Sequence, residues 1–157
     1  MVALHGHAPS HAEEGATGLL HEAGKVSFRR NDDGVWLAAS VGCCVAQIAK
    51  SIIFRSGETP ILVVASGINR IDRAKVGAAL GRKVERADPA WVEATTGFAV
   101  GGVAPVGHLA PALILIDEDL LALDPVWAAA GSPAHAFRTT PADLVRVTGG
   151  SVANVKA

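Results

Sequence analysis

The sequence is poor in the side chains on which several classes of protein depend. Tyrosine is absent, and aromatic residues make up only 4% of the 157 residues. Sheets that bind nucleic acid by stacking bases on aromatic side chains are therefore disfavoured. Because half of the residues are hydrophobic, the core must be built mainly from Val, Ile, Leu and Ala.

Cysteine is also scarce, and its placement excludes two kinds of cross-link. The only two cysteines, Cys43 and Cys44, are adjacent. Such a pair makes neither a disulfide framework nor a metal site of the usual spacing, so we expect packing roles and a reducing compartment, by default the cytoplasm. The histidines of the lead-in segment predict no more than adventitious metal binding: His5, His7, His11 and His21. We expect no metal and no cofactor.

Charge is low and balanced, which excludes a protein that is basic throughout. Fourteen Lys and Arg stand against fifteen Asp and Glu, a formal net charge of −1. Any contact with a polyanion must therefore be local. Between residues 70 and 86, six basic residues stand against two acidic ones, a local net charge of +4. This stretch is either a nucleic-acid contact or a solvated helix face.

Membrane and secretion signals are missing as well. Residues 94–116 contain no Asp, Glu, Lys or Arg, which is long enough to span a bilayer. Several glycines and prolines interrupt this stretch, so we expect turns and strands there and no membrane contact. No secretory signal is readable in residues 1–25.

The common catalytic motifs are absent too. Ser132 lies in Gly-Ser-Pro, not in the G-x-S-x-G of serine hydrolases, and neither G-x-G-x-x-G nor H-E-x-x-H occurs. An ordinary serine esterase, a dinucleotide-binding enzyme and a zinc peptidase are therefore disfavoured.

The element pattern predicts a lead-in of residues 1–25, with a short helix at 11–23, and one domain over residues 26–157. Strands are expected at 26–28, 51–55, 60–65, 112–116 and 151–155, the second and third forming a hairpin. Helices are expected at 35–40, at 69–80 with Asn69 as the N-cap, at 89–96 after Asp88, and from Thr140 to the Gly149-Gly150 stop. This irregular interleaving predicts an α/β fold with a mixed, mostly antiparallel sheet and helices packed on it.

Two features of the sequence could contribute to catalysis or ligand binding. Lys50 follows Gln47-Ile-Ala at the start of an apolar strand, where its stem would be partly buried and its ammonium held in place. The second feature is the glycine-rich run 101–107, whose backbone can approach a ligand closely. Taken alone, each has a plainer interpretation: a strand-end lysine in solvent and a tight turn between strands.

Taken together, these segments resemble the YbaK/prolyl-tRNA-editing family, the INS-type, ProX-like trans-editing deacylases. The resemblance covers residues 34–155. It depends on Gln47-Ile-Ala-Lys-Ser-Ile-Ile-Phe-Arg55, Pro60-Ile-Leu-Val-Val-Ala65, the G-x-x-x-P element from Gly101 to Pro105 with Gly107, Ala129-Ala-Gly-Ser-Pro133, and Arg138-Thr-Thr-Pro-Ala-Asp-Leu144. It implies a freestanding α/β domain that hydrolyses the ester of mischarged aminoacyl-tRNA, often proline tRNA, without metal or cofactor. The implied partners are that tRNA and prolyl-tRNA synthetase, not DNA or a membrane.

The resemblance also implies roles for particular residues. Lys50 looks like the essential lysine, anchoring the 3′-terminal adenosine and facing a glycine-lined cleft, while Gly101 and Gly102 would hold the reacting carbonyl. The implied substrate contacts are Ser51, Val103, Pro105, Gly107, Gly131, Ser132 and His135. The candidate tRNA contacts follow from the local positive charge between residues 70 and 86 and are Arg70, Arg73, Arg82 and Lys83.

Some questions stay open at the level of sequence. The alanine-clearing branch tends to carry Asn after its lysine, whereas Ser51 stands here, so alanine specificity does not carry over. His135 fits a pocket residue or a surface histidine equally well. A non-catalytic aminoacyl-tRNA or synthetase-binding module, and a hydrolase of another small ester, are the alternative functions.

Overall fold

The computed structural model describes residues 26–27, 42–131 and 135–157. The helices expected at 11–23 and 35–40, and Ser132, lie outside these residues. The predicted boundary between a lead-in and a domain therefore stays a prediction.

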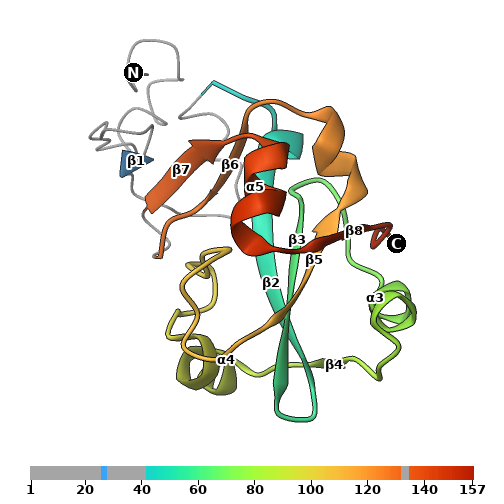
Figure 1. The fold of residues 1–157 in the computed structure, drawn as a ribbon. Helices are drawn as coiled ribbons and strands as arrows, with labels where there is room; N and C mark the ends of the chain where they lie inside the picture. Colours follow the sequence, from blue (N-terminus) through green and yellow to red (C-terminus); the bar gives the residue numbers. More distant parts are fainter. Residues whose placement is uncertain (1–25, 28–41, 132–134) are drawn as a thin grey trace.

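The described residues form one mixed sheet (Figure 1). Its strands follow the order β1-β7-β6-β2-β3-β5-β8, and β4 pairs with β2 off this path. Among the described strands, four pairings are antiparallel and three, β2 with β6, β3 with β5, and β5 with β8, are parallel. The predicted mixed α/β fold is confirmed. The strands are β1 Val26–Ser27, β2 Ile48–Ser56, β3 Thr59–Ser66, β4 Glu85–Arg86, β5 Leu113–Asp117, β6 Val126–Ala129, β7 His135–Thr139 and β8 Ser151–Ala153.

The predicted hairpin forms the centre of the sheet. Strands β2 and β3 pair from Ala49 with Ser66 to Ser56 with Thr59. Gly57 lies in the turn at φ 59°, a conformation that glycine adopts without strain. Because β2 begins at Ile48, Lys50 is its third residue.

The helices are α3 Arg73–Leu80, α4 Pro89–Thr96 and α5 Pro141–Thr148, with short 3₁₀ helices η2 Val45–Gln47 and η3 Glu118–Ala122. The caps predicted at Asp88 and Thr140 are confirmed, because both side chains accept a hydrogen bond from a first-turn backbone N–H. The cap predicted at Asn69 is wrong. Asp72 caps α3 by accepting from the backbone N of Ala74 at 2.9 Å, while Asn69 bonds elsewhere, as described below.

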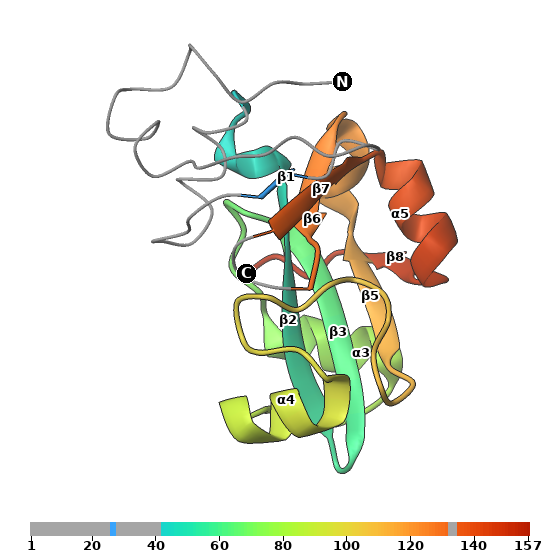
Figure 2. The ribbon, with the colours of Figure 1, turned by 90° about the vertical axis from the view of Figure 1, so that its left-hand side faces the viewer.

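The core has two parts, one on each face of the sheet. On one face, which we call the α3 face, Phe54, Ile61 and Val63 pack with Val76 of α3. On the other, the α4–α5 face, Ala49, Ile53 and Val64 pack with side chains of α4 and α5. Alternate residues of β2 therefore serve opposite faces, as the period of a strand requires. Figure 2 shows α4 and α3 in relation to the central hairpin.

The stretch without charged residues contributes no long helix. It comprises the end of α4, an irregular segment and most of β5. Across the described ranges, no helix is long and apolar enough to cross a membrane.

Candidate functional site

The site centres on one edge of strand β2. Strand β6 pairs with Ile48 and Ala49 at this edge, and β4 pairs with Phe54 and Arg55. Between these pairings, residues 50–53 have no strand partner there within the described part of the chain. Residues 97–112, which we call the glycine loop, run beside this part of β2 (Figures 1 and 2). A ligand at this open edge can reach side chains from both faces of the sheet.

Lys50 lies at one end of the open edge. It pairs with Ala65, so its side chain leaves β2 on the α3 face, with those of Ile52 and Phe54. The residue is half-buried, and its Nζ donates to the carbonyl oxygen of Gly67 at 3.4 Å. The ammonium is thus held at the turn that follows β3, and its proposed contact with substrate stays a prediction.

Ser51 points the other way. It lies two residues from both Ala49 and Ile53 and so shares their face of β2, on which these two residues pack together with Val103 of the glycine loop. Its Oγ is buried and has no hydrogen-bond partner among the residues that the structure describes. A buried hydroxyl without a partner costs about 1–3 kcal/mol, so this atom is a strong candidate for contact with a bound molecule.

The glycine loop has unsatisfied groups of its own. Val103 and Ala104 are buried, at 4% and 7% exposure, and their backbone N–H groups make no hydrogen bond to any described residue. The N–H of Gly102 already donates to the carbonyl of Ala99 at 2.9 Å. Gly101, at φ 89°, provides the backbone conformation that presents the following residues. Pro105 is buried.

Phe98, which is not among the predicted site residues, joins the loop to the turn after β6. A Cβ added at Gly107 or Gly131 would lie 3.7 Å or 3.5 Å from the Phe98 ring. The ring also meets that of His108 edge-on, with centroids 5.7 Å apart, and His108 Nε2 donates to the carbonyl of Ala104 at 2.7 Å. Phe98 therefore brings together two glycines that the resemblance had grouped. A scarce aromatic directly after a helix-ending glycine is the signal that could have found it.

His135 lies at the start of β7, half-buried, and its carbonyl accepts from Ala130 N at 2.9 Å. His135 lies two residues before Phe137, which packs on the α4–α5 face. Its side chain therefore leaves β7 on the same face as that of Ser51.

The basic residues gather around α3, not around the loop. Arg70 and Arg73 precede and begin α3, and Arg82 and Lys83 follow it. All four are exposed, and Lys83 pairs with Glu85 at 3.5 Å. The α3 side therefore presents positive charge to solvent.

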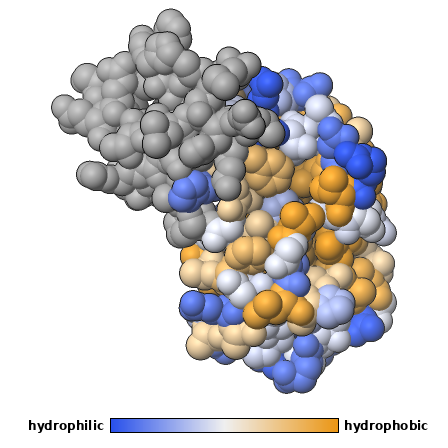
Figure 3. All heavy atoms as spheres, turned by 60° about the vertical axis from the view of Figure 1, so that its left-hand side comes forward, coloured by the Kyte–Doolittle hydropathy of each residue, from blue (hydrophilic) through white to orange (hydrophobic). Residues whose placement is uncertain are grey.

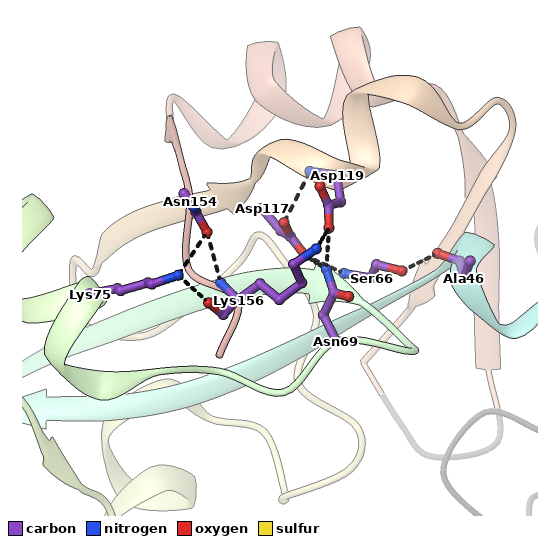
Figure 4. Close-up of polar contacts among 8 residues, drawn as sticks. All are labelled: Ala46, Ser66, Asn69, Lys75, Asp117, Asp119, Asn154 and Lys156. Carbon is purple, nitrogen blue, oxygen red and sulfur yellow. Dashed lines mark hydrogen bonds and ion pairs between the residues drawn. The ribbon is translucent and has the colours of Figure 1, made fainter.

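A buried polar cluster lies at the carboxyl ends of β3 and β5 (Figure 4). The carboxylate of Asp117, fully buried, accepts from Ser66 N at 3.1 Å, from Asn69 Nδ2 at 2.7 Å and from Asp119 N at 3.0 Å. Asn69 Nδ2 also donates to Asp119 at 2.8 Å, and Lys156 pairs with Asp119 at 3.4 Å. The hydrogen bond from Asn69, and then Lys156, lowers the pKa of Asp119.

The remaining titratable groups offer no metal centre. Within the described ranges, no group of three or more His, Cys, Asp or Glu side chains is placed to hold a metal ion. Burial, and then the neighbouring Cys44, raises the pKa of the Cys43 thiol to about 11. Cys43 is therefore a protonated, poorly nucleophilic thiol at neutral pH.

The chain is similar to a known domain family and to several known proteins. The model of the aminoacyl-tRNA editing domain family matches residues 35–147. The "Uncharacterized protein YwhH" of Bacillus subtilis is 35% identical over 108 residues, covering 68% of this chain and 69% of that protein. The "Putative Cys-tRNA(Pro)/Cys-tRNA(Cys) deacylase EbsC" of Enterococcus faecalis is 26% identical over 121 residues, covering 76% and 74%.

A solved structure described as "a putative trans-editing enzyme for prolyl tRNA synthetase" is also similar. It is 43% identical, its TM-score is 0.75, and the match covers 78% of each chain. This chain thus shares both sequence and fold with a protein described as a trans-editing enzyme.

Proposed function

Because the chain belongs to the family of aminoacyl-tRNA editing domains, we propose that it hydrolyses the ester of mischarged aminoacyl-tRNA in trans. The observation that carries this proposal is the set of unsatisfied polar groups at the open edge of β2. The buried Ser51 hydroxyl and the backbone N–H groups of the buried residues Val103 and Ala104 lack partners among the described residues. Buried polar groups normally have a partner, so a bound molecule that supplies one is the simplest explanation.

The chemistry needs only a modest catalyst. Water adds to the ester carbonyl carbon, the bond from that carbon to the ribose oxygen breaks, and the ribose oxygen leaves with a proton. Fixed N–H donors stabilise the negative oxygen that develops on the carbonyl, and each such donor contributes about 100-fold or more to the rate. We assign this role to the N–H groups of Val103 and Ala104. Gly101 and Gly102 shape the backbone that presents them.

Lys50 is proposed to hold the 3′-terminal adenosine by its phosphate. Its ammonium is a compact positive charge with a half-buried stem. It lies on the same face as α3, whose flanking residues Arg70, Arg73, Arg82 and Lys83 are exposed. We propose that the tRNA backbone follows this positive surface and that its aminoacyl end turns over the edge of β2 toward Ser51.

The acyl pocket is proposed to lie between Ser51, His135 and the glycines around Phe98. Ser51 and His135 share a face of the sheet, on which Phe98 packs against the core, and Gly107 and Gly131 lie beside the Phe98 ring. We assign Pro105, two residues before Gly107, to the same pocket. A small pocket would admit a noncognate amino acid and exclude a larger cognate one, which is how editing sites discriminate. One relative is described as a putative deacylase of Cys-tRNA(Pro) and another as a putative trans-editing enzyme for prolyl-tRNA synthetase, which supports proline tRNA as the tRNA and this synthetase as the partner. We propose the cytoplasm as the location.

The test is a panel of proline tRNA charged with Cys, Ala, Ser, Thr or Pro. We expect turnover of at least one noncognate ester, sparing of prolyl-tRNA, and a loss of about 100-fold in Lys50→Ala. Lys156→Ala, a lysine outside the proposed site, is the matched control and should retain the wild-type rate. Protection of the ester without turnover would favour a binding module, and equal cleavage of a free small ester would favour another esterase.

The basic surface has its own test. Replacing Arg82 and Lys83 with Gln should weaken tRNA binding and reduce the slope of log Kd against log salt by about 1.5. Arg146→Gln, which changes an exposed arginine of α5 on the other face, should leave that slope unchanged. An unchanged slope in the double variant would remove these residues from the interface.

A further inference from the structure

The polar cluster is connected to Lys50 by a short chain of contacts. Asp117 accepts the hydrogen bond from Ser66 N at 3.1 Å. Ser66 Oγ donates to the carbonyl of Ala46 at 2.7 Å, so the residue is held from both sides. The next residue, Gly67, carries the carbonyl that accepts the Lys50 ammonium at 3.4 Å.

Gly67 itself has little freedom to move. A Cβ added there would lie 2.4 Å from the carbonyl oxygen of Val45 and 3.2 Å from that of Ile48. Backbone approaches this close require glycine. The acceptor of the Lys50 ammonium is thus fixed by packing against η2 and by the hydrogen bonds of Ser66.

We propose that Asp117 is a positioning residue, which holds the Ser66–Gly67 turn and thereby the Lys50 ammonium. This inference rests on the proposed function, because it assigns Lys50 a role in the reaction. A lysine side chain has many rotamers, and a fixed acceptor restricts its ammonium to a small region beside the open edge. Asp117 lies 51 residues from Ser66 in sequence and belongs to another strand, so this role is visible only in the folded protein.

Asp117→Asn is the most specific test of this role, because it replaces one acceptor oxygen by a donor group at nearly constant side-chain size. The oxygen of the new side-chain amide can still accept the hydrogen bond from Asp119 N. Its NH₂ group then faces the N–H groups of Ser66 and Asn69 and cannot accept from either. We expect kcat for deacylation to fall about tenfold, with KM for the charged tRNA unchanged because the basic surface is intact. Asp119→Asn is the matched control: it changes the neighbouring carboxylate, which makes no contact with Ser66, and should leave kcat unaltered.

A double-mutant cycle separates positioning from general damage. If Asp117 acts through Lys50, Asp117→Asn should have no further effect on the residual rate of Lys50→Ala. A further tenfold fall in the double variant would overturn the proposal. Should Asp117→Asn fail to fold, Ser66→Ala loosens the same turn from its other side and should lower kcat about threefold, an effect also lost in the Lys50→Ala background.

A second measurement does not depend on activity. The rate at which an amine-directed acylating reagent modifies Lys50, followed by mass spectrometry, should rise severalfold in Asp117→Asn and not in Asp119→Asn. An unchanged rate at Lys50 would overturn the positioning role. If the wild type hydrolysed none of the charged tRNAs while the labelling changed as expected, the proposed function would fail and the positioning of the ammonium would stand.

Discussion

Two serines on neighbouring strands of the same hairpin show how differently the two regions of the molecule are built. Ser66 is 1% exposed, and both its backbone N–H and its hydroxyl donate to fixed acceptors. The hydroxyl of Ser51 is also buried, yet none of the described residues forms a hydrogen bond with it. The region around Ser66 satisfies its polar groups internally and so stabilises the fold. The region around Ser51 and the glycine loop leaves them unsatisfied, at a cost in stability that a bound molecule can offset.

Removing the acceptor at the centre of the polar cluster should have the largest effect on stability. Asp117→Ala leaves three donors without their acceptor, so the free energy of unfolding should fall by about 3 kcal/mol or more. Urea denaturation at pH 7 measures this. Asp143→Ala, which removes an exposed ion pair with Arg146 on α5, should change the free energy by less than about 1 kcal/mol. A fall below about 1 kcal/mol in Asp117→Ala would contradict the description of the cluster.

The two serines provide a matched pair for the next effect. Ser66→Ala leaves the carbonyl of Ala46 without its donor and should lower the free energy of unfolding by about 1 kcal/mol. Ser51→Ala removes an unpaired buried hydroxyl, so stability should stay the same or rise slightly. Deacylation should instead fall in Ser51→Ala, because the group is proposed to contact substrate. Equal destabilisation by both changes would show that Ser51 has a partner within the fold.

The smallest expected effect is a loss of stability at acidic pH. The pKa of Asp119 lies below its ordinary value of 3.8, first because of the hydrogen bond from Asn69. A lowered pKa in the folded state gives stability that is present above the ordinary pKa and is lost as pH falls through the lowered one. The free energy of unfolding of Asp119→Asn should therefore lie slightly below that of the wild type at pH 7 and converge with it as the pH falls through the lowered pKa. A difference that stays constant over this range would contradict this assignment.

The parts of the fold that could be predicted from sequence are those with local signals. Asp88-Pro89 and Thr140-Pro141 mark helix starts, and the two β-branched runs around Gly57 mark the hairpin, because caps and turns depend on neighbours a few residues away. Asn69 shows the limit of such rules. Its side chain donates to Asp117, 48 residues away in sequence, so a residue with good capping chemistry serves a tertiary contact instead.

The site was predictable only as a set of residues, not as an arrangement. The resemblance groups Lys50 with the loop 101–107. In the fold, strand alternation places the Lys50 side chain on the α3 face, whereas Val103 packs into the core of the α4–α5 face. The orphaned Ser51 hydroxyl and the junction at Phe98 both depend on segments that meet only in the folded chain. No local pattern could have predicted them.

The most direct test of the proposed site is a measurement of where the aminoacyl end of the substrate binds. A 3′-aminoacylamino-adenosine, in which an amide replaces the ester, can be titrated into ¹⁵N-labelled protein. We predict chemical-shift changes largest at the amides of Ser51, Val103 and Ala104, with those of Asn69, Asp117 and Asp119 little changed. Changes confined to the polar cluster, with the glycine loop unaffected, would contradict the assignment of the glycine loop as the binding region.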